Sequence, residues 1–463
     1  MTEIAKIEDL RKEIRNVTLD IFHLIAKRIK LGEEIGRVKS SLGLPLVNST
    51  IEAELRSAVR QHCAKKDIDE KFGMRILTML LQETIVREAH SSGKEFISAS
   101  KMFARAKELE RAGKRIIHLE VGEPDFTPPR QVLDETKGAM YGGYTRYTLS
   151  SGIPELRAKI ASHLSERWDV KIPENRVICT AGARFGIFAA MSAILSPGGE
   201  IINIDPNWPA YGETAEFLGV RVRTVSTALE DGWAPSMEEI ENSINDSTQM
   251  LILSYPSNPT GKVLDAKTLG KIVKIAEKHN IPILSDEVYS EYAFVPYKSI
   301  LEFETPNSIV VSSFSKTYSM TGFRIGYAVA SEDVIARMAK IQELALLSLP
   351  HFIQVGAMKA FDDNDYVRRN VARMKERIDV ASRLLIKLPL KFRKPDGGLY
   401  IFARGNHEKF NGNRFATNLL EKKGVAVTPG SGFGNYTNFF RISLNKPTKE
   451  LSAGIRRIGD LLL

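Results

Sequence analysis

Four side chains that could do chemistry follow apolar segments of the chain: Asn258, Asp286, Tyr289 and Lys316. Asp286 follows the apolar segment 281–284, where a carboxylate needs a cationic partner, and a pyridinium nitrogen would supply one. A lysine beside it could act as a nucleophile. Lys316 alone would be interpreted as a solvated surface residue, and the Asn-Pro pair alone as a turn. The prediction therefore depends on the four residues occurring together.

Short apolar runs alternate with helical stretches from about residue 95 onward, which is typical of a mostly parallel α/β sheet. The runs are RVICTAG, EIINIDPNW, MLILSYPSNPTG, IPILSDEVY and SIVVSSFSK. Each run ends in polar or glycine residues, and ligands of open α/β sheets bind beyond the carboxyl ends of the strands. Successive strand and helix units would thus bring Asn258, Asp286 and Lys316 to one edge. From about residue 350 the elements are more mixed and suit a small capping domain.

Several separated motifs in this region occur in the order of a known family. They are LEVGEPDFTPP (119–129), YTLSSGIPELR (147–157), the Asn258 turn, DEVY (286–289), the Lys316 segment and FRIS (440–443). The region resembles the class I/II aminotransferases, which are pyridoxal-phosphate enzymes of fold type I. The resemblance covers about residues 95–463. It implies an α/β fold with a mostly parallel central sheet and a small α/β domain.

The resemblance also implies a set of cofactor contacts. Lys316 would hold pyridoxal 5'-phosphate covalently and later serve as general base, which suits the removal of an amino acid's α-proton. Asp286 would keep the pyridine nitrogen protonated, and Asn258 and Tyr289 would bond the phenolate oxygen. The phosphate would be bound at a helix N-terminus and by nearby side chains, as such sites suit dianions. These phosphate ligands are the amides of Gly182, Ala183 and Arg184, the side chains of Ser313, Ser315 and Arg324, and Tyr147 reaching the neighbouring subunit of a homodimer.

The same resemblance assigns the substrate contacts. Arg441 would hold the substrate α-carboxylate through two hydrogen bonds, which a planar guanidinium favours. Gly122 would let the substrate approach the backbone closely, and Trp208 would stack on the cofactor ring. Asn258 would also face the substrate. Arg184 would meet the distal carboxylate of dicarboxylic substrates, although a helix-start arginine could equally face solvent or phosphate.

The first 92 residues predict an all-helical domain. Apolar residues repeat at heptad positions from residue 7 to residue 39, which predicts one long helix. Arg28 occupies one of these positions, where a buried cation is costly unless an anion pairs with it. The helix would end near residues 42–45, a capping box at 49–52 would begin a second helix, and a third would run from about 70 to 90. A polar break at 91–94 divides the chain into domains 1–92 and 93–463.

Three cations of this region, Arg11, Arg28 and Lys39, are spaced by 17 and 11 residues. Arg28 and Lys39 lie on nearly one helix face at about 100° per residue. Arg11 lies about 25 Å away along the helix and about 100° off that face, so it would have to come from a partner chain. This domain resembles the all-helical (AroQ-type) chorismate mutases over about residues 5–90. That family forms an intertwined dimer in which an antiparallel mate donates the arginine.

Chorismate carries two carboxylates, and its rearrangement builds negative charge on an ether oxygen, so preorganised cations favour it. The resemblance implies that Arg11 and Arg28 hold carboxylates and Lys39 the ether oxygen. Glu52 would bind the substrate hydroxyl, and Thr84 and Glu88 would supply further polar contacts. The departures from the family pattern are Asn48 in place of Asp, Ile51 in place of Arg and Glu88 in place of Gln. Because a glutamate donates only when protonated, mutase activity should rise toward acidic pH.

The composition bears on whether the protein binds nucleic acid, a membrane or a metal. The 463 residues are 43% hydrophobic and 26% charged, as in ordinary globular proteins. The net charge of +9 is spread without a run of five Lys or Arg, so small anionic substrates explain it as well as nucleic acid does. No segment of 18 apolar residues and no secretory signal are found, which favours a cytoplasmic protein without membrane contact. Cys63 and Cys179 lack metal-ligand spacing and suit buried thiols, so no metal is expected.

The sequence therefore predicts a bifunctional enzyme of aromatic amino acid biosynthesis. It would rearrange chorismate to prephenate and transaminate prephenate, arylpyruvates or oxaloacetate with glutamate or aspartate. One alternative is an aspartate/aromatic aminotransferase whose mutase-like domain senses phenylalanine or tyrosine. Another is a transcription regulator, which needs a helix-turn-helix of short helices in place of the long heptad helix. A lyase or decarboxylase is a third, because the motifs fix the cofactor and not the fate of the carbanion.

Overall fold

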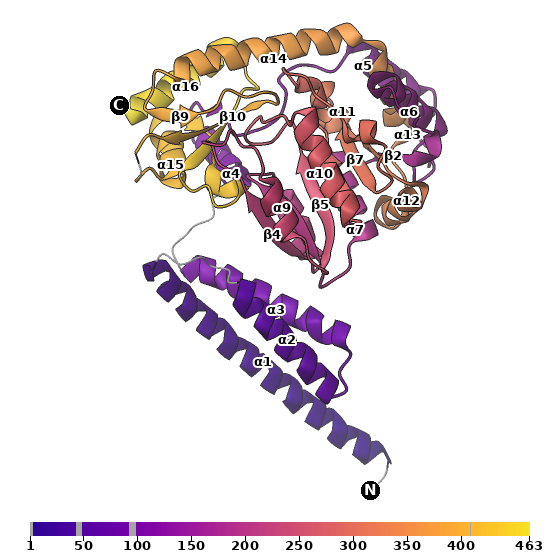
Figure 1. The fold of residues 1–463 in the computed structure, drawn as a ribbon, viewed down its shortest axis with the longest axis vertical. Coiled ribbons are helices and arrows are strands. Elements are labelled where there is room, and N and C mark those ends of the chain that lie inside the picture. Colours follow the sequence, from indigo (N-terminus) through magenta and orange to yellow (C-terminus); the bar gives the residue numbers. More distant parts are fainter. Residues whose placement is uncertain (1–2, 43–48, 92–98, 408) are drawn as a thin grey trace. The chain divides into compact units, whose positions relative to one another are not determined.

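The computed structural model describes residues 3–42, 49–91, 99–407 and 409–463. Its chain divides into two compact units, residues 1–96 and 97–463. The first is a bundle of three helices (Figure 1). These helices are α1 (Glu3–Leu42), α2 (Ser49–Lys65) and α3 (Glu70–Ser91). The three predicted helices are thus present; α1 begins at Glu3, before the heptad pattern starts, and ends at Leu42, where the sequence predicted its end.

Helix α1 packs on α3 through a face that is not its apolar heptad stripe. Gly32 and Gly36 are buried in this face. A Cβ on Gly32 would come 2.5 Å from the Thr84 side chain, so the small residue lets the two helices approach closely. The heptad residues remain exposed to between 47% and 66% of their surface. They are Ile7, Leu10, Ile14, Val17, Ile21, Leu24, Leu31, Ile35 and Val38. An apolar stripe of this length on one helix is typical of an interaction surface.

The second unit is built on a seven-stranded sheet with the order β2-β8-β7-β6-β5-β3-β4. All neighbouring strands are parallel except β8, which runs antiparallel to β2 and β7. The expectation of a mostly parallel sheet is confirmed. The strands are β2 (Val177–Thr180), β3 (Glu200–Asp205), β4 (Arg221–Ser226), β5 (Thr248–Ser254), β6 (Ile283–Asp286), β7 (Ser308–Ser313) and β8 (Gly326–Val329). The five predicted runs form β2, β3, β5, β6 and β7.

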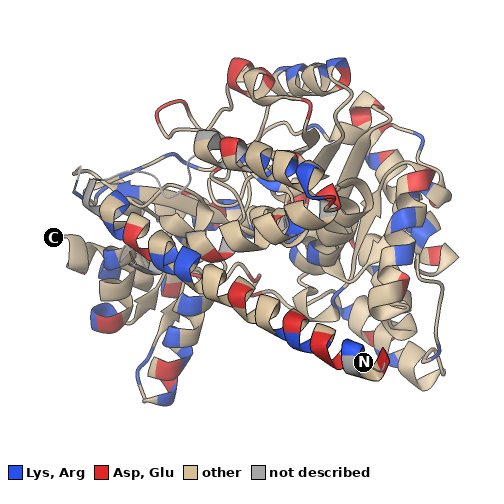
Figure 2. Ribbon diagram, turned by 90° about the horizontal axis from the view of Figure 1, so that it is seen from below, with Lys and Arg blue, Asp and Glu red and all other residues tan. Residues whose placement is uncertain are grey.

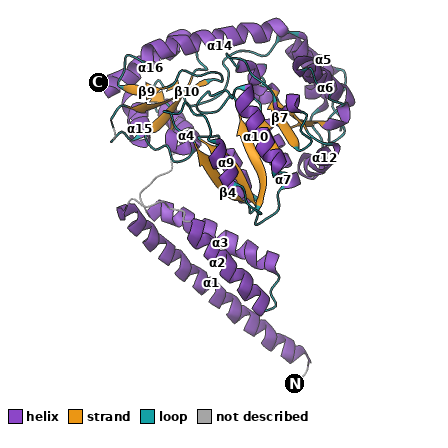
Figure 3. Ribbon diagram, viewed as in Figure 1, coloured by secondary structure: helices purple, strands orange, loops and turns teal. Residues whose placement is uncertain are grey.

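Helices cover both faces of this sheet (Figures 1 and 3). Successive residues of a strand point to opposite faces, and here the residues on both faces are apolar, so each face needs a covering layer. In β5, Met250 and Ile252 face one layer, and Leu251 and Leu253 face the other. The first layer contains α7 (Gly182–Ile194), α8 (Ala210–Phe217) and α12 (Glu332–Leu346). The second contains α5 (Arg130–Tyr141), α6 (Pro154–Trp168), α9 (Met237–Ser243), α10 (Ala266–Lys278) and α13 (His351–Met358).

A smaller sheet with its own core forms the capping region. Its four antiparallel strands have the order β12-β13-β10-β9, and a short parallel pair joins β1 to β11. The strands are β1 (Ile117–His118), β9 (Leu390–Phe392), β10 (Tyr400–Gly405), β11 (Val425–Ala426), β12 (Thr428–Pro429) and β13 (Phe439–Ser443). The helices packed with them are α4 (Ala99–Arg111), α14 (Asn364–Leu385), α15 (Gly412–Lys423) and α16 (Thr448–Leu462).

The charged residues are interspersed in the structure, as they are along the sequence. Lys and Arg lie beside Asp and Glu on the same helices (Figure 2). Within the described ranges, no helix is both long and apolar enough to cross a membrane. Cys63 and Cys179 are both buried and free, as the sequence predicted.

Candidate active sites

The ends of three adjacent strands bring the predicted polar residues together. In the sheet, β6 lies between β5 and β7. The last residues of β5 and β6, Ser254 and Asp286, are in register, and Asp286 pairs with Val311 two residues before the end of β7. Asn258 follows β5, Asp286 ends β6, and Lys316 lies in the short helix α11 (Phe314–Thr317) that follows β7. Local sequence positions each residue at a strand end, and the parallel sheet places those ends at one edge.

Asp286 is a buried carboxylate, 7% exposed. Its oxygens accept hydrogen bonds from the Tyr211 phenol at 2.6 Å and from the Val288 amide at 3.1 Å. Burial raises the pKa of Asp286, and the bond from Tyr211 opposes that rise. Among the described residues no Lys, Arg or His forms an ion pair with Asp286. A buried carboxylate of this kind fits a cationic ligand atom such as a pyridinium nitrogen.

Lys316 is enclosed by the strand ends and by the backbone of a neighbouring segment. Its Nζ donates a hydrogen bond to the carbonyl of Gly122 at 2.7 Å. Burial lowers the pKa of Lys316 from its ordinary value. A buried lysine of lowered pKa is more often neutral, which is the form that acts as nucleophile and base.

Arg441 lies on β13 of the small sheet and bonds Asn258 of the large one. Its Nη1 donates to Asn258 Oδ1 at 2.8 Å, while Nη2 donates to Thr428 Oγ1 at 3.2 Å and to the Glu120 carbonyl. The guanidinium carbon lies 4.2 Å from the centre of the Tyr400 ring. Within the described ranges the buried Arg441 Nε has no hydrogen-bond partner. This fixed, incompletely satisfied cation suits a carboxylate ligand.

Tyr289 and Tyr400 form a second link between the two sheets. Their phenol oxygens are 2.8 Å apart, and their rings meet edge to face. Burial raises the pKa of Tyr289, so its phenol keeps its proton. A Cβ on Gly122 would come 1.9 Å from the Tyr400 oxygen. Only glycine fits this position without movement of Tyr400.

The N-terminus of α7 is open for an anion. Gly182 begins this helix with φ +78°, and its N-cap residue, Ala181, makes no side-chain capping bond. The Arg324 guanidinium lies beside Gly182, where an added Cβ would come 2.7 Å from Nη2. Ser313 caps α11 by accepting a bond from the Ser315 amide at 3.1 Å. Free helix N–H groups beside a cation suit a phosphate dianion.

Arg184, Trp208 and Tyr147 lie at the outer part of this region. The Arg184 guanidinium lies 5.0 Å from the centre of the Trp208 ring, and its Nη2 is 3.6 Å from the exposed Glu213 carboxylate. Trp208 meets the Tyr211 ring edge to face at 5.6 Å. Tyr147 is 83% exposed and is therefore available to a second chain.

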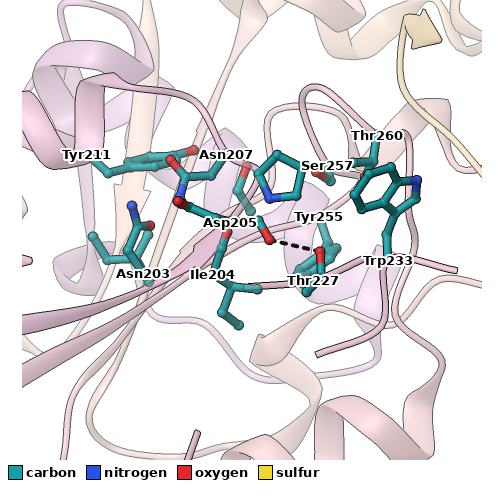
Figure 4. A pocket seen from close by; sticks show the side chains of 13 residues that line it. Asn203, Ile204, Asp205, Asn207, Tyr211, Thr227, Trp233, Tyr255, Ser257 and Thr260 are labelled. Carbon is teal, nitrogen blue, oxygen red and sulfur yellow. Dashed lines mark hydrogen bonds between the residues drawn. The ribbon is translucent and has the colours of Figure 1, made fainter. Parts of the chain in front are cut away.

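A small polar cavity of about 10 Å³ lies at the ends of β3 and β5, beside Tyr211 (Figure 4). Asp205 lies at its centre, and burial raises the pKa of this carboxyl to about 7. Asn207 Nδ2 donates to the Asp205 carboxylate, and Thr227 Oγ1 donates to the Asp205 carbonyl at 2.8 Å. The cavity thus continues the row of polar strand ends past β5.

In the helical bundle the structure brings Arg28 and Thr84 together. Arg28 Nη1 donates to the Thr84 hydroxyl and to the Leu80 carbonyl of α3. Lys39 is half-buried on the same helix, and Arg11 is exposed. Glu52 and Glu88 belong to α2 and α3, but their side chains, like residue Asn48, lie outside the described part of the structure.

Sequence reasoning missed three residues of this strand-end site. Tyr211 holds Asp286, Tyr400 contacts both Tyr289 and Arg441, and the Glu120 carbonyl orients Arg441. Tyr211 lies three residues after Trp208, a predicted site residue, and this proximity was a weak indication that Tyr211 belongs to the site. Glu120 lies in the quoted motif 119–129, but nothing in the sequence indicated its contact with Arg441, and the contacts of Tyr400 likewise join distant segments.

Comparison with known proteins identifies both units. Residues 114–458 match the family "Aminotransferase class I and II", and residues 10–89 match "Chorismate mutase type II". The chain is 35% identical to an aspartate aminotransferase of Sulfolobus acidocaldarius over 373 residues, which cover 78% of this chain and 92% of the relative. It is 34% identical to an Aquifex aeolicus protein named probable aspartate/prephenate aminotransferase, covering 78% of this chain and 94% of the relative.

Solved structures share the fold of the second unit. The crystal structure of an aspartate aminotransferase from Thermotoga maritima superposes with a TM-score of 0.76 at 34% identity, covering 79% of this chain and 97% of that one. The strand-end site agrees with the fold match of the second unit, and the three-helix bundle agrees with the family match of residues 10–89. The chain therefore belongs to the class I and II aminotransferase family and carries an N-terminal chorismate mutase type II domain.

Proposed function

We propose that the second unit is a pyridoxal-phosphate-dependent aminotransferase that acts on dicarboxylic and aromatic substrates. The observation that carries this proposal is the convergence of Lys316, Asp286 and Asn258 at one sheet edge, facing Arg441. The donor set fits the cofactor. Asp286 is a buried carboxylate suited to a protonated ring nitrogen, and the open α7 N-terminus with Arg324 suits a phosphate.

The chain's own residues then have distinct tasks. Bound pyridoxal phosphate would withdraw electrons from the amino acid's α-carbon, which makes loss of the α-proton feasible. Lys316 would hold the cofactor and, as a neutral amine, move that proton at its Nζ. Arg441 would orient the α-carboxylate, and Asn258, whose Oδ1 accepts a hydrogen bond from Arg441 Nη1, would keep the guanidinium in place. Tyr289 would donate its phenol proton to the cofactor's ring oxygen.

Arg184 would select dicarboxylic substrates. Its guanidinium lies over Trp208, the residue proposed to stack on the cofactor ring, and its exposed partner Glu213 is only a weak competitor. We expect Arg184→Ala to lower kcat/KM for aspartate and glutamate and to leave phenylalanine nearly unaffected. Unaltered kinetics with aspartate, glutamate and prephenate would remove this role.

The helical unit would rearrange chorismate to prephenate. Arg28 and Thr84 are in contact, so a cation and a hydroxyl are held together as a carboxylate site requires. The name of the Aquifex aeolicus relative, probable aspartate/prephenate aminotransferase, supports a reaction order in which prephenate from the first unit, or arylpyruvates derived from it, would be aminated by the second. This would make the chain a bifunctional homodimer in aromatic amino acid biosynthesis.

A panel of substrates tests both activities on the full chain. Prephenate, phenylpyruvate and oxaloacetate would be offered with glutamate and with aspartate, while chorismate loss is followed separately. Lys316→Ala should abolish transamination and retain mutase activity, and Arg28→Ala should do the reverse. Loss of a substrate's carboxyl group without amino transfer would instead favour a decarboxylase.

A regulatory mutase-like domain is the main alternative. It predicts no chorismate turnover, and transamination that responds to added phenylalanine or tyrosine. Between pH 5 and 8, catalysis with Glu88 as donor predicts faster chorismate turnover at lower pH. Glu88→Gln should remove that dependence, whereas a flat wild-type profile would exclude Glu88 as the donor.

A further inference from the structure

Residues 117–122, here called the strap, support both ends of the proposed substrate site. The Leu119 amide donates to the Ala426 carbonyl at 2.9 Å, and the Leu119 carbonyl accepts from the Ser443 amide at 2.7 Å. One residue further, the Glu120 carbonyl accepts from the Arg441 guanidinium. At the end of the strap the Gly122 carbonyl accepts from Lys316. The path of the strap therefore sets the positions of the Arg441 and Lys316 side chains.

The side chains of His118 and Glu120 point to the same side of the strap, because they are two residues apart in extended chain. His118 Nδ1 lies 2.7 Å from Glu120 Oε1, and His118 Nε2 lies 3.0 Å from Glu110 Oε1 on α4. The imidazole thus joins two carboxylates from different segments. Lys107 pairs with the other oxygen of Glu110 at 2.8 Å, and the Phe103 ring packs against the imidazole at 6.0 Å.

The charge balance of this cluster requires a cation at His118. Glu120 is 1% exposed, and within the described ranges its Oε2 has no hydrogen-bond partner. Burying an ionised carboxylate is costly unless a cation pairs with it. Among the described residues, His118 is the one basic side chain that pairs with the Glu120 carboxylate, since Arg441 bonds only the Glu120 carbonyl. The bond to Glu120, and to a lesser degree that to Glu110, raises the pKa of His118.

We propose that His118 is a positioning residue for transamination. As a cation shared by Glu110 and Glu120, it holds the strap so that the Glu120 carbonyl orients Arg441 toward the substrate carboxylate. This inference rests on the proposed function, since it takes Arg441 as the carboxylate ligand. His118 touches neither Lys316 nor Arg441, so its effect on the substrate is indirect.

Deprotonation of His118 should weaken carboxylate binding. A neutral imidazole has one N–H and cannot donate to both glutamates. Its second nitrogen would then face a carboxylate oxygen with a lone pair, and the buried charge of Glu120 would lose its compensation. The affinity of the site for a substrate carboxylate is therefore expected to fall as pH rises above the ordinary histidine range. The cause would be a shift of the strap, which positions Arg441.

The test compares His118→Gln with the wild-type holoenzyme and with His279→Gln as matched control. His279 also lies near a glutamate, Glu241, at 3.5 Å, but belongs to the far end of α10. Calorimetry would measure the binding of maleate, a dicarboxylate without an amino group, at pH values from about 6.5 to 9. Steady-state kinetics with glutamate would separate KM from kcat.

We expect His118→Gln to weaken maleate binding and raise KM by about fivefold to tenfold at pH 6.5, the usual scale for residues that act through a neighbour. Its kcat should stay within about twofold of wild type. Wild type and His279→Gln should both lose maleate affinity as pH rises, whereas the affinity of His118→Gln should not depend on pH in this range. Glu110→Gln should weaken binding in the same way, whereas Glu108→Gln, on the same helix but paired with Arg105, should not.

Equal maleate affinity and equal pH profiles in wild type and His118→Gln would overturn the positioning role. So would a variant whose kcat and melting temperature fall together without a change in KM, because that pattern belongs to a purely structural residue. A wild-type enzyme that neither transaminates amino acids nor binds maleate would instead overturn the proposed function itself. The two failures are therefore distinguishable.

Discussion

The Tyr211 phenol donates a hydrogen bond of 2.6 Å to the Asp286 carboxylate, and both side chains are buried. Tyr211 comes from α8 and Asp286 from β6, so helix packing on the sheet sets the state of the carboxylate. This contact stabilises the charged form of Asp286 against the effect of burial. It thereby favours the ionised carboxylate, the form that can pair with a protonated ring nitrogen.

Tyr211→Phe should weaken pyridoxal phosphate binding. Loss of a hydrogen bond to a charged group costs about 1.5–3 kcal/mol, which corresponds to a loss of affinity of about tenfold or more. The pKa of Asp286 should also rise further, because the Tyr211 bond lowers it. Fluorescence titration of the cofactor-free protein would measure the affinity. Tyr318→Phe, which removes a buried phenol away from Asp286, is the control, and equal affinities would contradict the prediction.

Gly122→Ala should impair the site without a large loss of stability. The added Cβ would lie 1.9 Å from the Tyr400 oxygen, so Tyr400 must move and the bond from Lys316 to the Gly122 carbonyl must change. We expect kcat/KM to fall by about a hundredfold, since small displacements of reacting groups have effects of that size. Gly138→Ala in α5 meets no atom within 4 Å and should be active and slightly more stable. Full activity of Gly122→Ala would show that Tyr400 adapts freely.

Strand ends were predictable from sequence, and contacts between distant segments were not. Asp286 and Lys316 follow apolar runs with the period and length of buried strands, so each could be placed locally. The contact of Arg441 with Asn258 joins residues 183 positions apart, one on strand β13 and the other in the turn after β5. No periodicity encodes such a contact, and only the family motifs indicated it. The heptad of α1 predicted a helix correctly, but this structure buries other residues, such as Gly32, against α3.

Cofactor loading should depend on the neutral form of Lys316. Burial lowers the pKa of this lysine, so the fraction of neutral amine is large at a lower pH than for a solvated lysine. The loading rate should increase with pH and level off below pH 10.5, the ordinary pKa of lysine. Absorption of the bound cofactor, followed after mixing at several pH values, measures this rate. A rate that still rises through pH 10.5 would exclude a lowered pKa.

The exposed apolar stripe of α1 and the position of Arg11 together predict a mutase site shared between two chains. Arg11 lies 17 residues before Arg28 on one continuous helix, about 25 Å away, so both cannot reach one substrate within a chain. A second copy packed on the stripe could supply Arg11. Arg11→Ala and Arg28→Ala chains should therefore each lack mutase activity.

Mixed dimers of these two variants decide the question. In a mixed dimer one site combines Arg28 of the first chain with Arg11 of the second and is intact, while the other site lacks both. If equal amounts of the two chains are co-expressed and pair at random, about a quarter of all sites should be active. Chorismate consumption by the mixture would thus reach about a quarter of the wild-type rate. If Arg11 instead serves the site of its own chain, every site in the mixture lacks one arginine and no activity returns. Transamination by the same mixture serves as the internal control, because neither substitution touches Lys316 or Arg441.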